Sequence, residues 1–589
     1  MYRLHLMKIQ RVSMLILFIL MVGCDQTIKP SSEVKTIADD LYNLILEESI
    51  YLRLQNELPI TFFPDMTYEN ALANVERAKT MIARIDAVDQ SVINHSDNLT
   101  LAMMRQFLQR DVDGLDYYWN EFSITPYNIY WADYMKQVFS TFKFENQDDM
   151  DLYLKLVSEY KDFFNQQLDK LKIQDEKGFQ LPKPELPLVR GVISQYQLSA
   201  KAMLTPNRDR LSRLSEEKIN DFFIRLENKI SNEVLMAFDS ILAFLEGDYS
   251  NRASERVGAY QYPGGKDYYN YRIKAITSLN LTAEEIHEIG MRNVEALYKK
   301  MAALRGKLGF EKGQKSFHEK IMNDPHFIAK TSDEVEARYM SYIRKIEPHI
   351  DRLFSKQPEA PYGVTRLSQA LEGSMTFGYY ARPTPDNPVG EYNYNGSNLN
   401  NRPMLWAGPL IYHELVPGHH FQINLSLENE DMPEIRKDLI LAGAANVEGW
   451  GNYGAKLAEE IGMLEDPLDQ YGWAVFHIFF STRLVVDTGM NALGWSLEEA
   501  RDFMRKYTFA TETEIATETL RYAVDMPGQA LAYKIGMDKF FELRSHMQNE
   551  LGDNYNIRDF HDAVLIEGPM PLNILEKHID WTIDRIKKE

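Results

Sequence analysis

Residues 412–422 have the strongest potential for chemistry in this sequence. They contain His413 directly followed by Glu414, and two further histidines, His419 and His420, lie a few residues later. Imidazole nitrogens are common zinc ligands, and a glutamate beside a ligand histidine can act as the general base for a zinc-activated water. The segment therefore predicts a zinc site of the hydrolytic type.

The spacing of these residues differs from that of the usual HExxH helix. In that motif the second histidine lies four residues after the first, one turn further along the same face. Here the next histidines lie six and seven residues after His413. On an unbroken helix they would lie about 10 Å further along the axis, whereas two imidazole nitrogens on one zinc ion lie only ~3–3.5 Å apart.

Pro417 and Gly418 stand between these histidines and favour a break or bulge in the helix. Such a kink can fold either His419 or His420 back toward His413. The alternative is a buried helix end with a cluster of polar residues and no metal.

A hydrolytic zinc site needs a third protein ligand, and Glu448 is the best candidate. Glu448 lies within residues 446–453, on a second helical pattern that continues through Leu457 and Ile461. A carboxylate from a neighbouring helix is the usual third ligand when a His-Glu motif supplies two histidines. By itself, a glutamate on an amphipathic helix is more often a solvated surface residue.

The elements that position these residues are expected to be mostly helices. Residues 215–246, 282–306 and 332–357 carry apolar side chains at three- and four-residue spacing, with charged residues between them. Thr282, followed three residues later by Glu285, matches a helix-capping pair. The sequence therefore predicts a mainly α-helical fold.

Residues 356–409 break the helical pattern. They are rich in proline and include the Tyr/Asn-rich run 390–396, whose alternation predicts a short strand or hairpin. Because this segment leads directly into the His-Glu motif, we expect a small β segment beside the metal site. An exposed strand edge there could bind an extended peptide by backbone pairing. A surface loop with chance aromatic residues is the alternative.

The N-terminus has the pattern of a bacterial lipoprotein signal. Basic residues precede the apolar run 14–22, which is too short to span a bilayer. The run ends in Met-Val-Gly-Cys, which resembles a lipobox, so residues 1–23 are predicted to be a signal peptide and Cys24 the lipidated residue. Residues 24–35 would be a tether. We expect an extracytoplasmic protein, periplasmic or at the cell surface, with a lipid anchor in the membrane. An ordinary cleaved signal with an accidental cysteine is the alternative.

Length and composition are those of an ordinary globular protein. The 589 residues can bury a large core, and 44% hydrophobic with 26% charged residues is typical. The formal net charge of −21 argues against nucleic acid as a partner. Cys24 is the only cysteine, which excludes disulfides and cysteine catalysis. We divide the mature chain into an N-terminal helical half, residues 36–265, and a C-terminal half with the zinc site, residues 266–589, as one continuous unit.

Several ordered motifs together resemble the bacterial family known as domain of unknown function 885. The first motifs are His-Glu-x-x-Pro-Gly-His-His-x-Gln at residues 413–422 and Glu-Gly-Trp at 448–450. They are followed by Asp-Thr-Gly at 487–489, Arg-Tyr-x-x-x-x-Pro-Gly-Gln-Ala-x-x-Tyr-Lys-x-Gly at 521–536, and Phe-His-Asp at 560–562 with Gly568 and Pro571-Leu572. These motifs cover about residues 412–572, and a weaker likeness extends back to roughly residue 35.

This family is grouped with zinc metallopeptidases and is similar to helical gluzincin oligopeptidases and carboxypeptidases. The resemblance implies a large helical fold with a deep cleft and one Zn²⁺ ion. His413 would be the first ligand, Glu448 the third, and Glu414 the general base. Related peptidases place a glycine directly before the second ligand histidine, which points to His419. His420 would then orient a neighbour or contact substrate, and the reverse assignment of the two stays open.

The resemblance also implies residues around the reacting carbonyl group. The developing oxyanion needs a hydrogen-bond donor besides the metal. Tyr522 is the first candidate for this donor and Tyr533 the second, although either could be a packed aromatic residue. Arg521 and Gln529 would hold a substrate carboxylate or backbone, with structural hydrogen bonding as the alternative.

Two positions depart from the family pattern. Members typically read Asp-Thr-Gly-x-His, where this chain has Asn491, and their Glu-Gly-Trp motif continues to Tyr-x-Glu, where this chain has Ala455. Asn491 can donate a hydrogen bond but carries no charge, so slower catalysis or a different substrate class is expected. Asp487 is expected to orient a ligand histidine, or else to cap a helix, and Gln422 to contact substrate or support a ligand.

The sequence therefore leads to the hypothesis of a zinc-dependent peptidase that hydrolyses short peptides, as an oligopeptidase or a carboxypeptidase. One alternative is a non-catalytic lipoprotein that contains zinc and binds peptides or partners. A second is a zinc hydrolase of a non-peptide amide. Structural zinc is usually closed by four protein ligands, so Glu414 beside a three-ligand set favours catalysis. The sequence leaves the oligomeric state undetermined.

Overall fold

The computed structural model describes residues 30–368, 372, 378–384 and 386–589. In this part the chain is mainly α-helical with one three-stranded sheet, which confirms the predicted fold class. The predicted signal peptide and the lipidation site Cys24 lie outside the described residues. Within them, no helix combines the length and apolar character needed to cross a bilayer.

The last part of the predicted tether is helical. Helix α2 (Pro30–Glu48) begins inside it, and Val34 is buried in the main core. Val34, Ile37 and Leu41 are all buried and recur at three- and four-residue spacing, so this segment presents an apolar stripe that packs against the rest of the protein.

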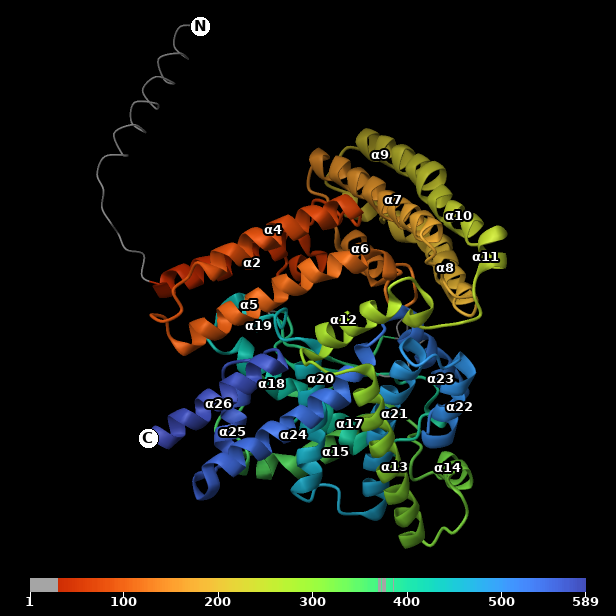
Figure 1. Ribbon diagram of the computed structural model, residues 1–589. Helices are drawn as coiled ribbons and strands as arrows, with labels where there is room; N and C mark the ends of the chain where they lie inside the picture. Colours follow the sequence, from red (N-terminus) through yellow and green to blue (C-terminus); the bar gives the residue numbers. More distant parts are fainter. Residues whose placement is uncertain (1–29, 369–371, 373–377, 385) are drawn as a thin grey trace, which may run out of the picture.

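The N-terminal helices form an elongated upper layer in Figure 1, drawn in red to yellow. After α2 they are α3 (Ile50–Gln55), α4 (Tyr68–Asp86), α5 (His95–Gly114), α6 (Tyr130–Thr141), α7 (Gln147–Glu176), α8 (Leu186–Leu204), α9 (Glu216–Lys229), α10 (Leu235–Phe244) and α11 (Asp248–Arg252).

The C-terminal helices and the sheet form the body below this layer (Figure 1). The helices are α12 (Gly265–Thr277), α13 (Ala283–Lys307), α14 (Gln314–Met322), α15 (Ser332–Ile346), α17 (Ala407–Glu414), α18 (His419–Leu427), α19 (Glu434–Lys437), α20 (Ala444–Glu460), α21 (Pro467–Asn491), α22 (Leu497–Tyr507), α23 (Glu512–Leu520), α24 (Ala532–Leu551), α25 (Ile557–Leu565) and α26 (Leu572–Lys588). A π-helical segment, Arg521–Asp525, follows α23.

The predicted helices are present, with one difference in length. Helix α13 is capped by Thr282. The Thr282 hydroxyl accepts a hydrogen bond from the Glu285 backbone N–H, and the Glu285 carboxylate accepts one from the Thr282 backbone N–H. The helix predicted to reach residue 357 ends as α15 at Ile346 and continues as a 3₁₀ turn, Glu347–Arg352. Pro348 lies in the first positions of that turn, and a proline lacks the N–H that an α-helix would need there.

The three strands lie just before α17 in the chain, as predicted for residues 390–396. Strand β3 (Gly390–Tyr394) pairs in parallel with β1 (Tyr362–Arg366) and antiparallel with β2 (Tyr379–Ala381), so the order is β1-β3-β2. Alternate residues of β3 are buried, as expected for a strand with one face on the core. Strand β2 therefore forms one edge of this sheet.

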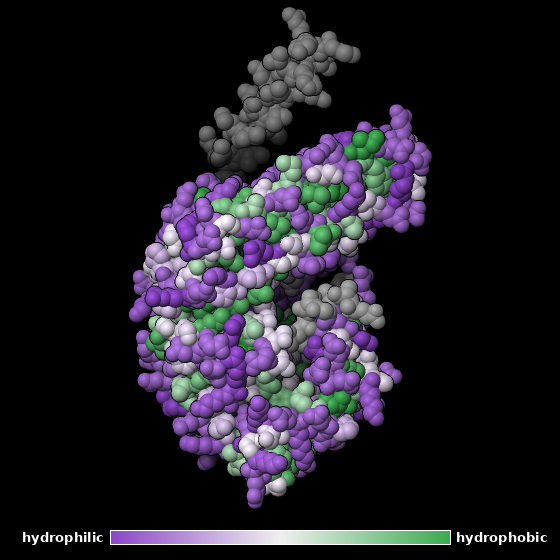
Figure 2. All heavy atoms as spheres, turned by 90° about the vertical axis from the view of Figure 1, so that its right-hand side faces the viewer, coloured by the Kyte–Doolittle hydropathy of each residue, from purple (hydrophilic) through white to green (hydrophobic). Residues whose placement is uncertain are grey.

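The upper layer and the body share their hydrophobic cores. The largest core contains Val34 and Leu101 together with Leu543 and Ile579, and a second core joins residues of α7 and α10 to residues of α21 and the π-helical segment. Residues on both sides of the predicted boundary at residue 265 therefore contribute to the same cores. Figure 2 shows that the surface is hollowed between the upper layer and the body on one face.

Candidate metal centre

The chain reverses between α17 and α18, and this reversal brings the histidines together. Helix α17 ends at Glu414 and α18 begins at His419, with a cis peptide bond between Val416 and Pro417. A Cβ atom on Gly418 would lie 1.8 Å from the carbonyl oxygen of His413. Only a glycine lets the chain pass this close to the end of α17, so the predicted break at the Pro-Gly pair is present.

His413, His419 and Glu448 converge on one point. The Nε2 atoms of both histidines lie 3.6 Å from Oε2 of Glu448. One potential ligand atom from each of the three residues lies within 4.8 Å of the other two. The two imidazole rings have centroids 4.6 Å apart and are nearly perpendicular. Bonds of about 2 Å to a single zinc ion require ligand atoms at roughly this spacing, so the donor set and geometry fit a tetrahedral zinc site with one open position.

Asn452 fixes the orientation of His413. Its side-chain nitrogen donates to the carbonyl oxygen of Tyr533 at 3.2 Å, so its oxygen faces His413 and accepts from Nδ1 at 3.0 Å. Nδ1 of His413 then carries the proton, and Nε2 presents its lone pair toward Glu448. Sequence analysis missed Asn452, although its position one helical turn after Glu448 was a usable signal.

The residues between Glu448 and Asn452 explain why the Glu-Gly-Trp motif accompanies this site. The indole N–H of Trp450 donates to the carbonyl oxygens of Pro417 and Gly418 at 3.0 and 3.1 Å, which ties α20 to the reversal. A Cβ atom on Gly451 would lie 2.6–2.9 Å from atoms of the His413 ring. The glycine therefore lets the imidazole pack directly on α20.

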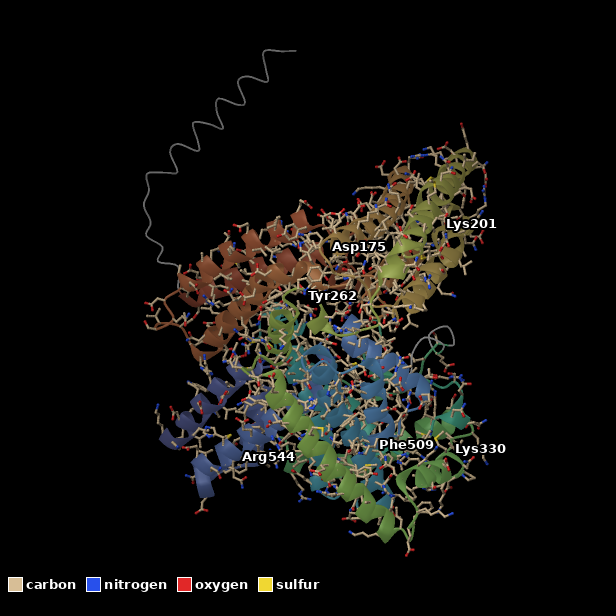
Figure 3. All side chains as sticks on the ribbon, turned by 45° about the vertical axis from the view of Figure 1, so that its right-hand side comes forward. Asp175, Lys201, Tyr262, Lys330, Phe509 and Arg544 are labelled. Carbon is tan, nitrogen blue, oxygen red and sulfur yellow. The ribbon has the colours of Figure 1, made fainter. Side chains whose placement is uncertain are left out.

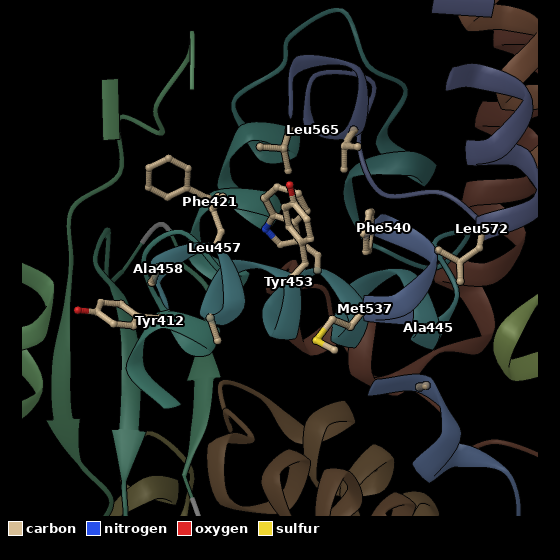
Figure 4. Packing of buried hydrophobic residues seen from close by; sticks show 14 of the residues in the cluster. Tyr412, Phe421, Ala445, Tyr453, Leu457, Ala458, Met537, Phe540, Leu565 and Leu572 are labelled. Atoms are coloured by element: carbon tan, nitrogen blue, oxygen red, sulfur yellow. The ribbon is translucent and has the colours of Figure 1, made fainter. Parts of the chain in front are cut away.

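The apolar surroundings of α20 complete this support. Figure 4 shows Phe421 of α18, Tyr453 of α20 and Phe540 of α24 among the packed side chains of the main core. On the same helix α20, Ala455, where the family pattern has a glutamate, is fully buried in this core.

The two glutamates of the site differ in acidity. Burial alone would raise the pKa of Glu448, but contacts with His413 and His419 outweigh it and hold the pKa below its ordinary value. Burial raises the pKa of Glu414, and the charge of Glu448 adds to this, while the two histidines act in the opposite direction. The backbone N–H of Tyr380, on edge strand β2, also acts to lower the pKa of Glu414. Glu448 is thus suited to be an anionic ligand and Glu414 to accept a proton.

His420 points away from the triad. Its Nε2 atom lies 3.0 Å from the carbonyl oxygen of Ala360, and its Nδ1 atom lies 3.0 Å from the Asn424 amide nitrogen and 3.1 Å from the Tyr380 hydroxyl. Burial lowers its pKa to about 4, so the ring is neutral. With both nitrogens engaged, His420 supports strand β2, and His419 is the histidine beside His413.

The two candidate oxyanion donors occupy different places. Tyr522 is fully buried, and its hydroxyl is held by Glu518 and by Arg483, whose Nε donates at 2.7 Å. Tyr533 is partly exposed; its ring lies 6.4 Å from that of His413 in a near-parallel orientation, and the charge of Glu448 acts on it. The first choice, Tyr522, does not fit an oxyanion donor, because its hydroxyl is used in the core. Of the two tyrosines, Tyr533 is the one that lies beside His413.

Arg521 and Gln529 lie next to Tyr533. Arg521 donates to Gln529 Oε1 at 2.9 Å and contacts Glu518 at 3.3 Å, and the Gln529 side chain acts to lower the pKa of Tyr533. The Nε atom of Arg521 is buried without a hydrogen-bond partner among the described residues. Sequence analysis missed Arg483, which lies 4.8 Å from the Tyr533 ring centroid; nothing in its helical pattern marked it.

Asp487 and Asn491 form a structural network rather than a support for a ligand. Asp487 accepts from the Tyr269 hydroxyl at 2.7 Å and from the Gly528 backbone at 3.0 Å. Asn491 donates to Asp487 and to the carbonyl oxygen of Tyr522, and accepts from the Ala259 backbone. The expectation that Asp487 orients a ligand histidine or caps a helix is wrong, because it lies inside α21 and its carboxylate holds the Pro527-Gly528 turn. Burial raises its pKa to about 7.

Gln422 is also buried, and its hydrogen bond goes to a residue of α20 that does not belong to the triad. Its amide nitrogen donates to Asn446 Oδ1 at 2.9 Å, which joins α18 to α20. The structure therefore gives Gln422 a packing role beside the site.

Comparison with known proteins supports both the family and the fold. Residues 61–579 match the family described as "Bacterial protein of unknown function (DUF885)". A crystal structure of a "putative lipoprotein" from Colwellia psychrerythraea is similar, with a TM-score of 0.80 and 22% identity over 94% of this chain and 99% of that one. A "putative lipoprotein of unknown function" from Shewanella oneidensis gives a TM-score of 0.71 and 16% identity over 92% and 98%. At these identities the likeness shows the fold alone. No curated protein matches the chain.

Proposed function

This chain belongs to the DUF885 family, and we propose that it is a zinc-dependent peptidase that cleaves short peptides. One observation carries the proposal: His413, His419 and Glu448 converge as a three-ligand set, with Glu414 next to His413 at the end of the same helix. A structural zinc site needs neither an open position nor an adjacent carboxylate.

Zinc bound to this triad would polarise a water molecule and the substrate carbonyl. The other roles belong to the side chains of the chain. Glu414 would take the proton from the attacking water and pass it to the leaving amine. The Tyr533 hydroxyl would donate to the oxygen that gains negative charge. Edge strand β2, whose Tyr380 backbone acts on the pKa of Glu414, would pair with the substrate backbone.

The experiment that tests this proposal is the Glu414→Gln variant. Zinc content should remain near one ion per chain, because Glu414 is not a ligand, while kcat should fall by about 10²–10⁴ with the loss of the general base. Glu430→Gln, an exposed glutamate on the surface near α18, serves as the control. Hydrolysis by Glu414→Gln at the wild-type rate would refute the proposal.

Arg521 favours a carboxypeptidase over an enzyme that cuts within long chains. Arg483 and Arg521 both pair with the carboxylate of Glu518, at 2.9 and 3.3 Å. Because two positive charges share one negative charge, this group of three residues keeps one excess positive charge next to Tyr533. An anionic chain end would balance that charge, and Arg521 Nε is a donor still to be satisfied. Wild type should prefer peptides with a free C-terminus over their amides, and Arg521→Met should lose this preference. Arg292→Met, an exposed arginine, should keep it.

Two alternatives are separated by the same measurements. A non-catalytic zinc protein would bind peptides with equal affinity in wild type and Glu414→Gln and hydrolyse none. A hydrolase of a non-peptide amide would lose activity in Glu414→Gln but act only on other amides in a substrate screen.

We place the protein outside the cytoplasm, held to a membrane by a lipid on Cys24. The similar structures named as "putative lipoprotein" support this placement, together with the lipobox-like sequence. Cys24→Ser should move the protein from the membrane fraction to the soluble one.

A further inference from the structure

Four aromatic side chains of the upper layer contact one another at its surface. Tyr51 on α3 and Tyr130 at the start of α6 are 40% and 43% exposed. The ring centroid of Tyr134 lies 5.4 Å from that of Tyr51 and 5.9 Å from that of Tyr130, and the Trp131 centroid lies 5.0 Å from that of Tyr130. Trp131 and Tyr134 are partly buried against the second core. These four residues are called the aromatic surface below.

Exposed aromatic rings that contact one another are typical of binding surfaces. A single exposed apolar residue is normal, whereas a contiguous group keeps a larger apolar area in water. Tyrosine and tryptophan supply a large contact area at a low cost in conformational entropy and are enriched where proteins bind partners. Their rings make favourable contacts with other aromatic groups. The aromatic surface therefore suits an aromatic or large apolar group of a ligand.

One end of the aromatic surface is joined to strand β2. The Gln55 side-chain amide donates to the Tyr51 hydroxyl, and Gln55 Oε1 accepts from Arg382 Nη2 at 2.6 Å. Arg382 directly follows Ala381, the last residue of β2. Because β2 is the strand proposed to pair with the substrate backbone, this end of the aromatic surface lies close to the proposed path of the peptide.

The other end of the aromatic surface lies near Arg521. The half-buried ring of Tyr127 lies over the Arg521 guanidinium, whose Cζ is 4.8 Å from the ring centroid. Tyr127 precedes Tyr130 by three residues, so the Cα atoms of these two tyrosines lie at most about 11 Å apart. The upper layer therefore supplies aromatic side chains close to both Arg521 and β2.

The segment that carries Tyr127 is held firmly against the body. The Tyr127 backbone N–H donates to Asp525 Oδ2 at 3.2 Å, and the Asn128 side-chain amide donates to the Asp525 carbonyl oxygen at 2.6 Å. Phe122, a few residues earlier, packs on Tyr262 with ring centroids 5.9 Å apart, and Figure 3 shows Tyr262 at the junction of the two layers. These contacts fix the position of the aromatic surface relative to the candidate site.

The charges next to the aromatic surface fit the free C-terminus of a peptide. Arg483 and Arg521 pair with the single carboxylate of Glu518, which leaves one excess positive charge beside Tyr127. A terminal carboxylate would balance this charge. Two residues of an extended peptide span about 7 Å, so a carboxylate bound at Arg521 would leave the last side chains of that peptide within reach of the aromatic surface.

We propose that the aromatic surface binds aromatic or large apolar side chains in the last two residues of a peptide whose free carboxylate lies at Arg521. This inference rests on the proposed function, because it names the substrate class of the same site. The body supplies the metal ligands and Arg521, whereas α3 and α6 of the upper layer select the side chains. The aromatic surface shares no residue with the zinc triad, so it can be altered without changing the ligand set.

The test measures peptide binding to the full mature, zinc-loaded protein that carries Glu414→Gln, so that no hydrolysis is needed. Calorimetric titration should give a Kd for acetyl-Ala-Phe-Phe about 10-fold lower than for acetyl-Ala-Ala-Ala, because partial burial of two phenylalanine side chains has an effect of this order. Adding Tyr51→Ala or Tyr130→Ala should reduce this ratio to about 3 or less. Adding Tyr130→Phe should keep the ratio, because the ring remains.

Leu198→Ala is the matched control. Leu198 is 77% exposed on α8 of the same layer. It lies three residues before Lys201, which Figure 3 shows at the far end of the upper layer. This variant also removes exposed apolar area, but it should bind both peptides as its parent does. Circular dichroism checks that every variant is folded.

Three results would overturn the proposal. The first is an equal Kd for the two peptides in the parent protein. The second is a full preference in folded Tyr51→Ala and Tyr130→Ala variants. The third is a wild-type dimer in sedimentation that Tyr130→Ala converts to a monomer, since the aromatic surface would then bind a second copy of the chain. If the preference is found but wild type hydrolyses neither peptide, the peptidase proposal fails and this one stands. If wild type hydrolyses both peptides and the Kd values are equal, the reverse holds.

Discussion

Replacing Gly451 with alanine should damage the metal centre without unfolding the protein. The new Cβ atom would lie 2.6 Å from Cε1, 2.7 Å from Nδ1 and 2.9 Å from Nε2 of His413. To restore ordinary contact, the imidazole must retreat by roughly 0.8 Å or more. Phe476 packs on the same ring with centroids 6.0 Å apart, which limits the room for this retreat.

A displacement of this size exceeds what a zinc ligand tolerates, since ligand distances vary by only about 0.2 Å between good sites. We therefore expect Gly451→Ala to weaken zinc affinity at least as much as loss of a supporting contact, by about 10–100-fold. That corresponds to about 1.4–2.8 kcal/mol. In the metal-free protein, the overpacking cost of about 1–3 kcal/mol is partly offset by the gain of roughly 1 kcal/mol in helix propensity.

The assay is competition for zinc against a chromophoric chelator, combined with thermal unfolding of the metal-free protein. Gly191→Ala is the matched control, because Gly191 also lies within a helix but no atom lies within 4 Å of the position that its new Cβ would take. That control should bind zinc like wild type and be slightly more stable. If Gly451→Ala binds zinc with unchanged affinity, the packing of His413 on α20 does not set the ligand geometry and the reasoning fails.

Four further outcomes are expected. Asn452→Leu removes the acceptor for His413 Nδ1 and should weaken zinc affinity by about 10–100-fold in the same competition assay; an unchanged value would contradict the assigned tautomer. Tyr533→Phe should lower kcat by about 10²–10³ with little change in KM, as loss of one oxyanion donor does. Tyr522→Phe should instead lower the free energy of unfolding by about 1.5–3 kcal/mol, because its buried hydroxyl bonds to charged groups, and the reverse pattern in these two variants would refute the assignment. Burial lowers the pKa of His561 to about 4, while the unfolded residue titrates near 6.5. The unfolded state therefore binds the extra proton between these values, and stability should fall as pH decreases from about 6.5 toward 4, by up to about 3 kcal/mol. Urea unfolding of His561→Gln should show a smaller decline over this range, and an identical decline would exclude His561 as a cause.

Sequence reasoning succeeded where a feature depends on neighbours in the chain. Pro417 and Gly418 end one helix and allow the next because proline lacks an N–H and glycine lacks a Cβ. The capping pair at Thr282 and the alternating strand at residues 390–394 are equally local. Each of these predictions needed only the backbone preferences of a few consecutive residues.

It failed where a role depends on how helices are rotated against each other. Tyr522 and Tyr533 belong to one motif, and the sequence ranks Tyr522 first as the donor. In the structure the Tyr522 hydroxyl is bonded to Arg483 and Glu518, whereas the Tyr533 ring lies beside that of His413. The motif predicts that Asp487 supports a ligand, but α21 directs its carboxylate to the Gly528 backbone. The hydrophobic periodicity of the sequence does not encode the directions in which these side chains point, because those directions follow from the packing of α20, α21 and α24.

The sequence by itself determined that His413, Glu414 and Glu448 lie on helices and that the chain reverses before His419. The tertiary structure decided that His419 rather than His420 joins His413 and Glu448, and that Asn452 and Gly451 hold His413. The physical reason is that helix formation is governed by local hydrogen bonding and side-chain sterics. Which side chains face each other across helices is set by the joint packing of a core drawn from the whole chain.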